Sequence, residues 1–406
     1  MKINLPDNVK YIIDTLNKNG FEAYAVGGCV RDSILHKEPK DWDITTSALP
    51  EQVKELFRRT IDTGIAHGTV TVMLQHTGYE VTTYRVDGKY SDGRHPDSVE
   101  FTASLREDLR RRDFTINAMA YNDNDGLIDL FEGRDDIEKG LIRCVGNAEE
   151  RFTEDALRML RAIRFSAQLG FEIEEDTRNA IMLLAPSINK VSRERIHTEL
   201  NKILLSANPA YVEEAHLLGL TKYVFTGFET IADRAVMLKR VEYVQKSLPF
   251  KYAALLLDLG PDGVKKQLKE LKLDNDTVNR AELLTESHGL CLTDNRAGIR
   301  HQAARIPAEY ENVLCFEEAC YRAQGNEDMA EKVSVQRKIF ADIKEKKECL
   351  SIRELAINGN DLMARGIKPG KTVGEMLNRA LLLVLEAPEK NDYDILMEYV
   401  TREAFK

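Results

Sequence analysis

The sequence changes its hydrophobic pattern near residue 145, and this change constrains the fold more than any other feature. Between about residues 20 and 145, short runs of β-branched and aromatic residues alternate with Gly, Asp and Asn. After about residue 150, apolar residues recur at i, i+3 and i+4, as in 192–204 and 372–387. The first pattern is typical of strands and the second of amphipathic helices. We therefore predict an α+β part of roughly 140 residues followed by an all-helical remainder.

Three local predictions follow from the same patterns. The alternating runs at 68–74 and 79–85 flank Gln-His-Thr-Gly, which predicts a β-hairpin. The apolar run at 114–121 is interpreted as a helix that begins after three charged residues. The spacing in 154–171 predicts a further helix that begins near Glu154.

Composition excludes several classes of protein. A hydrophobic content of 43% with 31% charged residues is that of a globular chain, so wholesale disorder is excluded. Uninterrupted apolar runs reach only six residues, as at 252–257, far below the ~20 that a membrane helix needs. The N-terminus has no signal-peptide core, and the six cysteines form no CxxC pair, which argues against a zinc ribbon. We expect a cytoplasmic protein with reduced thiols and no membrane partner.

A Gly27-Gly28 turn comes directly after the apolar run 23–26, with Arg31 in the following residues. Two glycines between a strand and a helix let backbone N–H groups approach a phosphate, and an arginine there can bind the same phosphate. Turns of this kind also use glycine for geometry alone, so both interpretations stay open.

Paired carboxylates follow at Asp41 and Asp43, before the run 44–46. Residues i and i+2 of an extended strand point to the same side, so the two carboxylates repel each other unless a cation lies between them. Oxygen ligands of this type suit Mg²⁺ together with substrate phosphates. Glu80 is a candidate third acid. The alternatives are a solvated Asp-X-Asp at a strand edge and a surface glutamate on a hairpin.

These motifs resemble the head of the nucleotidyltransferase superfamily that includes DNA polymerase β, and more closely the class II CCA-adding enzymes and bacterial poly(A) polymerases. The resemblance rests on five segments in the family's order and extends into the tail. They are GGCVRD with DWDITT, RRDFTINAMAY (111–121), EDALRMLRAIRF (154–165), SRERIHTELNKIL (192–204) and NGNDLMARGIKPGKTVGEML (358–377).

The resemblance implies a polymerase-β-like head with a mixed sheet, followed by a helical neck, body and tail. We predict the head at 1–142, the neck at 143–208, the body at 209–300 and the tail at 301–406. The implied activity is addition and repair of the 3′-terminal CCA of tRNA from CTP and ATP, with release of pyrophosphate. The implied partners are the 3′ end and the acceptor and T-arm side of tRNA, and relatives are often homodimers.

The resemblance also assigns roles to single residues. It implies that Asp41 and Asp43 hold Mg²⁺ and that Asp113 is a candidate for recognising the ribose. The positions that match the family's nucleotide-binding residues are Gly28, Arg31, Arg112, Asp155, Arg158, Arg161 and Arg164. The helix dipole disfavours arginines at the start of a helix, so phosphate contact explains Arg111 and Arg112 better than a plain helix start does.

Asp155 and Arg158 carry the base-reading hypothesis. On one helix they would be i, i+3 neighbours, presenting an acceptor beside a donor. That pair complements the pairing edges of cytosine and adenine, whereas uracil and guanine show the reverse pattern and would leave polar groups unpaired. The alternative is an internal salt bridge from Glu154 to Arg158. Nine residues at ~100° each put Arg164 half a turn from Asp155, so we expect it to have a different role.

Two further regions carry predictions. The segment 85–100 corresponds to a flexible loop that the family needs for the change from C to A addition; the alternative is a long β-connection. Scattered basic residues are candidates for RNA phosphate contact, although charge runs are often only solvated. They are Lys239, Arg240, Lys246, Lys251, Lys265, Lys266, Lys269, Lys272, Arg365, Lys368 and Lys371.

Two other functions remain as alternatives. A poly(A) polymerase would use ATP only and usually carries a longer, basic C-terminal extension. The net charge of −10 and the end of the chain at Lys406, shortly after the tail segment, favour CCA addition. A non-catalytic RNA-binding relative is disfavoured by the intact acidic and base-reading residues.

Overall fold

A computed structural model gives the fold and describes residues 2–88, 99–289 and 292–404. The chain divides into two compact units, Met1–Thr230 with Glu270–Leu273 (unit 1) and Ile231–Lys269 with Asp274–Lys406 (unit 2). Among the described residues every strand lies before residue 174, in unit 1. The predicted order of an α+β head and a helical remainder is therefore confirmed. The finer division at residues 142, 208 and 300 stays a prediction.

The strands form a mixed seven-stranded sheet and two small two-stranded sheets. The described strands are β1 (Ala23–Val26), β2 (Ile44–Thr46), β3 (Thr60–Gly64), β4 (Thr69–Leu74), β5 (Thr77–Thr83), β6 (Arg85–Asp87), β7 (Val99–Phe101), β8 (Met119–Asn122), β9 (Gly126–Asp129), β10 (Leu141–Ile142) and β11 (Glu172–Ile173). In the large sheet the order is β3-β4-β5-β2-β1-β8-β9. Within it β2 and β5 are parallel and the other neighbours antiparallel.

The predicted hairpin is confirmed as β4 and β5. Gln75 and His76 connect the two strands with φ of 49° and 67°. Two successive residues of positive φ match the right-handed twist of a hairpin. The hairpin places Glu80 on the strand that runs beside β2.

The prediction of a helix at 114–121 is wrong. Thr115–Asn117 is a short 3₁₀ turn, and Met119–Asn122 is strand β8 between β1 and β9. Every residue of β8 is buried. An interior strand covered on both faces has no alternation of apolar and polar residues, so its pattern is indistinguishable from that of a buried helix.

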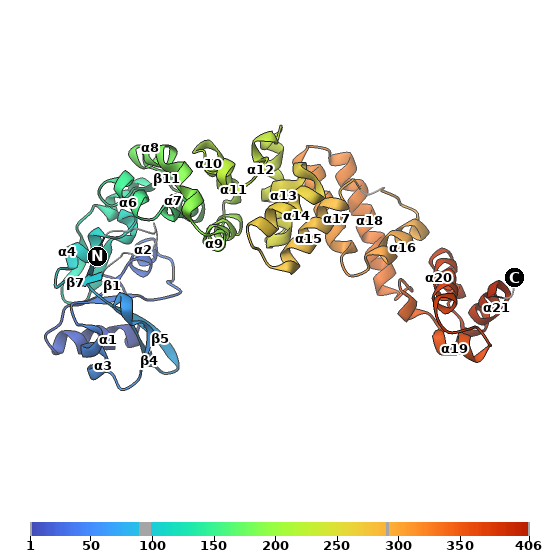
Figure 1. Ribbon diagram of the computed structural model, residues 1–406, viewed down its shortest axis with the longest axis horizontal. Coiled ribbons are helices and arrows are strands. Elements are labelled where there is room, and N and C mark those ends of the chain that lie inside the picture. The colour runs from blue at the N-terminus through green and yellow to red at the C-terminus, as the bar shows by residue number, and fades with distance from the viewer. Residues whose placement is uncertain (1, 89–98, 290–291, 405–406) are drawn as a thin grey trace. The chain divides into compact units, whose positions relative to one another are not determined.

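Helices surround the sheet and build the rest of unit 1. They are α1 (Asp7–Lys18), α2 (Gly28–Ile34), α3 (Pro50–Leu56), α4 (Leu105–Arg110), α5 (Gly133–Lys139), α6 (Ala148–Glu154), α7 (Leu157–Leu169), α8 (Glu175–Leu184), α9 (Arg193–Leu204), α10 (Val212–Leu217) and α11 (Thr221–Val224). Helices α1 and α3 lie beside the strands of the large sheet (Figure 1). α1 buries Val9, Ile12, Ile13 and Leu16, the i, i+3, i+4, i+7 face of an amphipathic helix.

The predicted helix at 154–171 is interrupted at its start. α6 ends at Glu154, Asp155 is extended with φ −144° and ψ 103°, and α7 begins at Leu157. The Asp155 carboxylate accepts a hydrogen bond from the Leu157 N–H at 3.0 Å. A short acidic side chain that binds the backbone in this way favours a helix start over a helix interior. The expectation that Asp155 and Arg158 are i, i+3 neighbours on one regular helix is therefore wrong.

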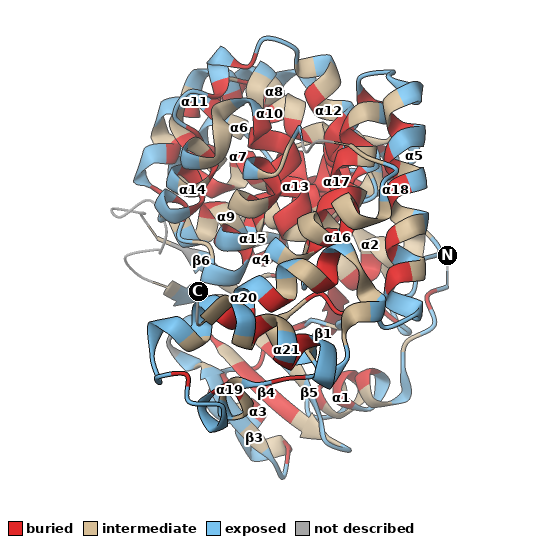
Figure 2. Ribbon diagram, turned by 90° about the vertical axis from the view of Figure 1, so that its right-hand side faces the viewer, coloured by how far each residue is buried: buried red, intermediate tan, exposed pale blue. Residues whose placement is uncertain are grey.

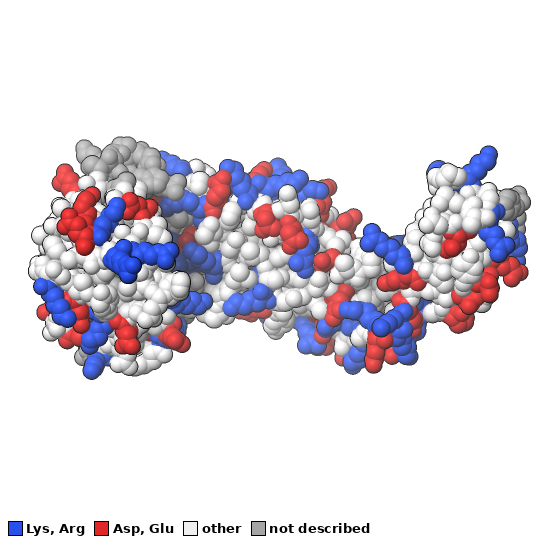
Figure 3. Space-filling model, turned by 90° about the horizontal axis from the view of Figure 1, so that it is seen from below, with Lys and Arg blue, Asp and Glu red and all other residues white. Residues whose placement is uncertain are grey.

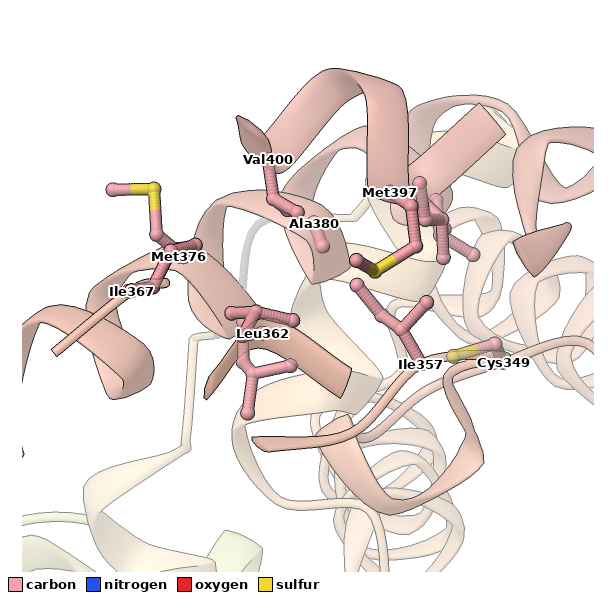
Figure 4. Packing of buried hydrophobic residues seen from close by; sticks show 11 residues of the cluster. Cys349, Ile357, Leu362, Ile367, Met376, Ala380, Met397 and Val400 are labelled. Atoms are coloured by element: carbon pink, nitrogen blue, oxygen red, sulfur yellow. The ribbon is translucent and has the colours of Figure 1, made fainter. Parts of the chain in front are cut away.

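Helices continue beyond residue 231. They are α12 (Arg234–Tyr243), α13 (Leu248–Leu256), α14 (Gly260–Glu270), α15 (Asn275–Glu286), α16 (Arg296–Arg305), α17 (Tyr310–Ala323), α18 (Glu327–Glu345), α19 (Gly359–Ala364), α20 (Lys371–Glu386) and α21 (Tyr393–Ala404). α13 is buried along almost its whole length and appears red with α17 in Figure 2. The last helices share a separate apolar cluster, in which Met397 of α21 is directed towards Ile357 (Figure 4).

Candidate active site

Asp41 and Asp43 lie immediately before β2, beside Glu80 of β5. The parallel register pairs Ile44 with Val81, so one residue earlier Asp43 stands beside Glu80. Removal from water raises the pKa of Asp43, the positive charge of Arg112 lowers it, and the charges of Glu80 and Asp41 raise it further. The net pKa of Asp43 is raised mainly because the carboxyl is removed from water, and the neighbouring negative charges add to the effect.

The chemistry of this pair fits a divalent cation. A cation would remove the repulsion that raises the pKa of Asp43, and carboxylate oxygens are the ligands that Mg²⁺ prefers. Within the described ranges no set of three His, Cys, Asp or Glu side chains is arranged to hold a metal. Besides carboxylates, Mg²⁺ commonly takes its ligands from water and substrate phosphates.

The glycine turn lies against Arg112. Gly27 has φ of +80°, and a Cβ atom on it would come within 3.0 Å of Arg112 Nη1. Gly27 is therefore required both for its backbone conformation and for the close approach of the guanidinium. Gly28 begins α2 directly after it. The backbone turn and a guanidinium thus lie on one side of the carboxylate pair.

Arg31 has side-chain partners in two separate segments of unit 1. It donates to Asp32 at 2.7 Å and to the Asn117 side-chain oxygen at 2.7 Å. Asn117 in turn donates to Asp113 at 3.4 Å. Asn117 therefore connects two of the predicted nucleotide-binding residues, and its role was not predicted.

Asp113 is buried and ion-paired. It accepts hydrogen bonds from Arg161 Nε at 2.7 Å and from the Phe114 N–H at 2.9 Å. Burial alone would raise its pKa, but the charges of Arg161 and Arg158 and the hydrogen bonds outweigh burial and lower the pKa to about 2. The carboxylate is therefore ionised at neutral pH and can accept hydrogen bonds from hydroxyl groups.

The two base-reading candidates each have an ion-pair partner. Asp155 accepts from Arg195 Nη2 at 2.7 Å and from Nη1 at 3.3 Å. Arg158 donates to Glu154 and to the Arg151 carbonyl, the latter at 3.0 Å. The Glu154–Arg158 salt bridge, which was the alternative interpretation, is thus present in the structure.

One cavity of about 270 Å³ collects most of these side chains. Its lining residues are Arg111, Arg112, Asp113, Asp155, Leu157, Arg158, Arg161 and Arg195. Five arginines and two carboxylates give the cavity a net positive charge, which suits a polyphosphate. The break between α6 and α7 directs Asp155 to this cavity, although that break was not predicted.

Arg164 has a different environment from the residues that line the cavity, and its different role stays a prediction. It pairs with Glu199 at 2.6 Å, and both side chains are almost fully buried. Burial is the largest influence and lowers the pKa of Arg164 to about 10, although Glu199 opposes the change.

Phe165 was not predicted to contribute to the site. Three of the arginines lie over its ring, with distances to the centroid of 5.2 Å for Arg31, 5.6 Å for Arg161 and 4.0 Å for Arg164. A cation over an aromatic face is stabilised by the ring quadrupole. Phe165 therefore gives each of these three guanidinium groups a favourable contact that partly offsets their mutual repulsion.

The basic residues proposed for RNA contact are only partly available. Arg240 and Lys251 are 3% and 4% exposed. Arg240 pairs with Asp258, and Lys251 donates to two backbone carbonyls. Including these two was wrong, because an internal partner and burial account for each. On the face seen in Figure 3, basic and acidic side chains are interspersed, so charge alone does not locate an RNA surface.

Most of the loop at 85–100 lies outside the described residues, and only its flanking strands β6 and β7 are seen to pair. No helix within the described part of the chain combines the length and apolarity that a membrane crossing needs.

Three family models match successive parts of the chain, with the polymerase head domain first. Residues 23–143 match the family described as poly A polymerase head domain. Residues 170–231 match the family described as probable RNA and SrmB-binding site of polymerase A, and residues 250–400 match the family described as tRNA nucleotidyltransferase domain 2, putative.

Relatives of known identity match almost the entire chain. The CCA-adding enzyme of Lactiplantibacillus plantarum is 38% identical over 96% of this chain and 94% of its own length. That of Ligilactobacillus salivarius is 39% identical over 97% and 96%. The structure of the Bacillus stearothermophilus CCA-adding enzyme in complex with CTP is 34% identical, covers 97% of both chains and has a TM-score of 0.76.

The head fold, the paired carboxylates and the arginine-lined cavity define a nucleotidyltransferase. With full-length relatives at this level of identity, the chain belongs to the CCA-adding enzyme family of tRNA nucleotidyltransferases. The resemblance inferred from the five sequence segments is confirmed.

Proposed function

We propose that this chain builds and repairs the 3′ CCA end of tRNA without a nucleic-acid template. The tRNA 3′-hydroxyl attacks the α-phosphate of CTP twice and then of ATP, and pyrophosphate leaves at each step. Family membership supports the reaction. The observation that carries the assignment of residues is the single cavity that brings together Asp113, Asp155, Arg158 and Arg161.

Asp41 and Asp43 are proposed to hold Mg²⁺, with Glu80 as a neighbouring acid. When bound, the metal would lower the pKa of the attacking hydroxyl and neutralise the triphosphate. Arg112 lies against the Gly27 turn, and Gly28 follows it, so these residues are proposed to bind the triphosphate. Arg31 is proposed to join them when its bonds to Asp32 and Asn117 are exchanged.

Asp155 and Arg158 are proposed to read the base. A carboxylate has about four acceptor sites, so Asp155 can keep its bond from Arg195 and accept a further N–H from the base. Cytosine and adenine offer an N–H to Asp155 and an acceptor to Arg158, whereas uracil and guanine offer the reverse pattern and leave polar groups of the base without partners.

The other residues are assigned supporting roles. Asp113 is proposed to accept from the ribose hydroxyls, since its carboxylate stays ionised. Arg161 holds Asp113. Arg164 is proposed to orient the pocket through Glu199 and Phe165 rather than to touch the base.

Extension of a tRNA transcript that lacks its last three nucleotides tests the function. With Mg²⁺, CTP alone should add two nucleotides, and CTP with ATP should add three. A long ladder with ATP alone would identify a poly(A) polymerase instead. Solved relatives include a Thermotoga maritima CCA-adding enzyme complexed with tRNA at 22% identity, which shows only that the fold is shared.

A further inference from the structure

Asp108 of α4 is a fully buried carboxylate next to the cavity, and the assignment of residues above gives it no role. Its Oδ1 atom accepts from Arg111 Nε at 3.0 Å and from Arg111 Nη2 at 2.7 Å. Its Oδ2 atom accepts from Arg112 Nη2 at 3.4 Å and from the Thr45 hydroxyl at 3.1 Å. Three side chains from two separate segments therefore converge on one carboxylate.

A buried carboxylate is costly unless it is fully partnered. Burial alone would raise the pKa of Asp108, but the charges of Arg112 and Arg111 and the bonds from Arg111 and Thr45 outweigh it, so the pKa is lowered. Asp108 is therefore an ionised anchor. Removing its charge takes a buried counter-ion from both Arg111 and Arg112.

The partners of Asp108 lie on the two parts of the site that a nucleotide must bridge. Thr45 is two residues beyond Asp43, on the same side of the extended chain. Arg112 faces the Gly27 turn and is the cation that lowers the pKa of Asp43. Asp108 thus links the strand that follows the paired carboxylates to the guanidinium at the glycine turn.

We infer that Asp108 is a positioning residue that fixes the Arg112 guanidinium relative to strand β2. A nucleoside triphosphate can then contact this guanidinium and the Asp41–Asp43 pair at the same time. The inference rests on the proposed function, in which Arg112 binds the triphosphate. It assigns Asp108 no contact with the base, so its effect is the same for CTP and ATP.

Asp108→Asn tests the inference, because it keeps the shape and removes the charge. Glu348→Gln is the matched control. Glu348 likewise accepts bonds from two arginines, Arg296 and Arg300, but lies in unit 2, outside the cavity. Both variants should lose thermal stability, so stability alone does not distinguish positioning from packing.

The distinguishing measurements are the Kd values of CTP and ATP in the absence of tRNA and the KM for tRNA. In Asp108→Asn both nucleotide Kd values should rise about tenfold, the effect of weakening one charge-assisted interaction, with their ratio and the KM for tRNA unchanged. Glu348→Gln should leave both Kd values unchanged. Unaltered nucleotide Kd values in Asp108→Asn, or a change in one nucleotide only, would overturn the inference.

Thr45→Val provides a second variant if Asp108→Asn does not fold. It retains Asp108 and both arginines and removes only the hydroxyl that joins β2 to the carboxylate. Both nucleotide Kd values should rise about threefold, and a value within error of wild type would overturn the link to β2. Whether the wild type extends tRNA decides the proposed function separately, because the Kd values are measured without tRNA.

Discussion

Arg195 of α9 holds Asp155 across 40 residues of sequence, with Nη2 2.7 Å from one carboxylate oxygen and Nη1 3.3 Å from the other. Both residues line the cavity described above. Since Asp155 is extended between two helices, its backbone alone does not determine where its side chain points. Arg195 and the Leu157 N–H together therefore hold the carboxylate that is proposed to accept from the base.

Arg195→Gln should relax nucleotide selection. Without the guanidinium the Asp155 carboxylate keeps its bond from the Leu157 N–H but loses both bonds from Arg195, so discrimination of CTP against UTP should fall about tenfold, which corresponds to ~1.4 kcal/mol. Extension of truncated tRNA with each nucleotide alone measures the ratio of kcat/KM values. Arg178→Gln is the control, because it breaks an arginine–carboxylate pair with Glu214 elsewhere in unit 1. Equal ratios in the two variants would contradict the role of Arg195.

Asp155→Ala and Asp41→Ala should fail differently. Asp155→Ala removes the base acceptor, so nucleotide choice should be lost while Mg²⁺ dependence stays close to that of the wild type. Asp41→Ala removes one of the paired carboxylates and should reduce transfer of every nucleotide by at least ~10³-fold. Transfer assays with a Mg²⁺ titration check both. Total loss of transfer in both variants, with Asp155→Ala unable to bind Mg²⁺, would remove this division of roles.

Phe165→Leu should weaken nucleotide binding without changing the choice of base. The leucine keeps most of the apolar volume but has no aromatic face for Arg31, Arg161 and Arg164, and such contacts are worth about 0.5–2 kcal/mol. The Kd values of CTP and ATP should therefore rise several-fold together. Phe316→Leu, at a fully buried phenylalanine of unit 2, controls for the loss of core packing. A Kd change as large in the control would mean that packing alone explains the result.

Local patterns were sufficient where the hydrophobic period and the side-chain chemistry agree. The β4–β5 hairpin and the helical remainder follow from periodicity. The pairing of Asp41 with Asp43 around a cation stays a prediction from their spacing. The sequence pattern of β8 predicts a helix and this prediction is wrong, because a strand buried on both faces has no alternation of apolar and polar residues.

Residues that act through distant partners could not be found from spacing. Asp108 is next to a predicted motif, but its bond to Thr45 joins positions 63 residues apart. Arg195 lies within a recognised segment, yet only the fold brings it to Asp155. Arg240 and Lys251 are basic residues of the type that binds RNA phosphates, but both are buried. Their burial depends on tertiary packing, which a local sequence pattern does not predict.

Lys251 should make the stability of the protein rise at alkaline pH. Burial and the charge of Lys246 lower its pKa from 10.5 to about 8, with Glu242 opposing them. Its ammonium group donates to the carbonyls of Val241 and Val244, at the end of α12. Between about pH 8 and 10.5 the unfolded chain holds this proton and the folded chain does not, so the free energy of unfolding increases with pH.

The increase due to this group is at most about 3 kcal/mol, because each pKa unit corresponds to ~1.4 kcal/mol. Urea unfolding of the wild type and Lys251→Met at about pH 7.5 and 10 measures it, since groups common to both proteins cancel in the difference. The free energy of unfolding of the wild type should increase relative to that of Lys251→Met as the pH rises. Lys239→Met removes an exposed lysine of α12, the helix next to Lys251 in sequence, and should show no such trend. A difference between wild type and Lys251→Met that does not depend on pH would mean that the buried ammonium keeps its ordinary pKa.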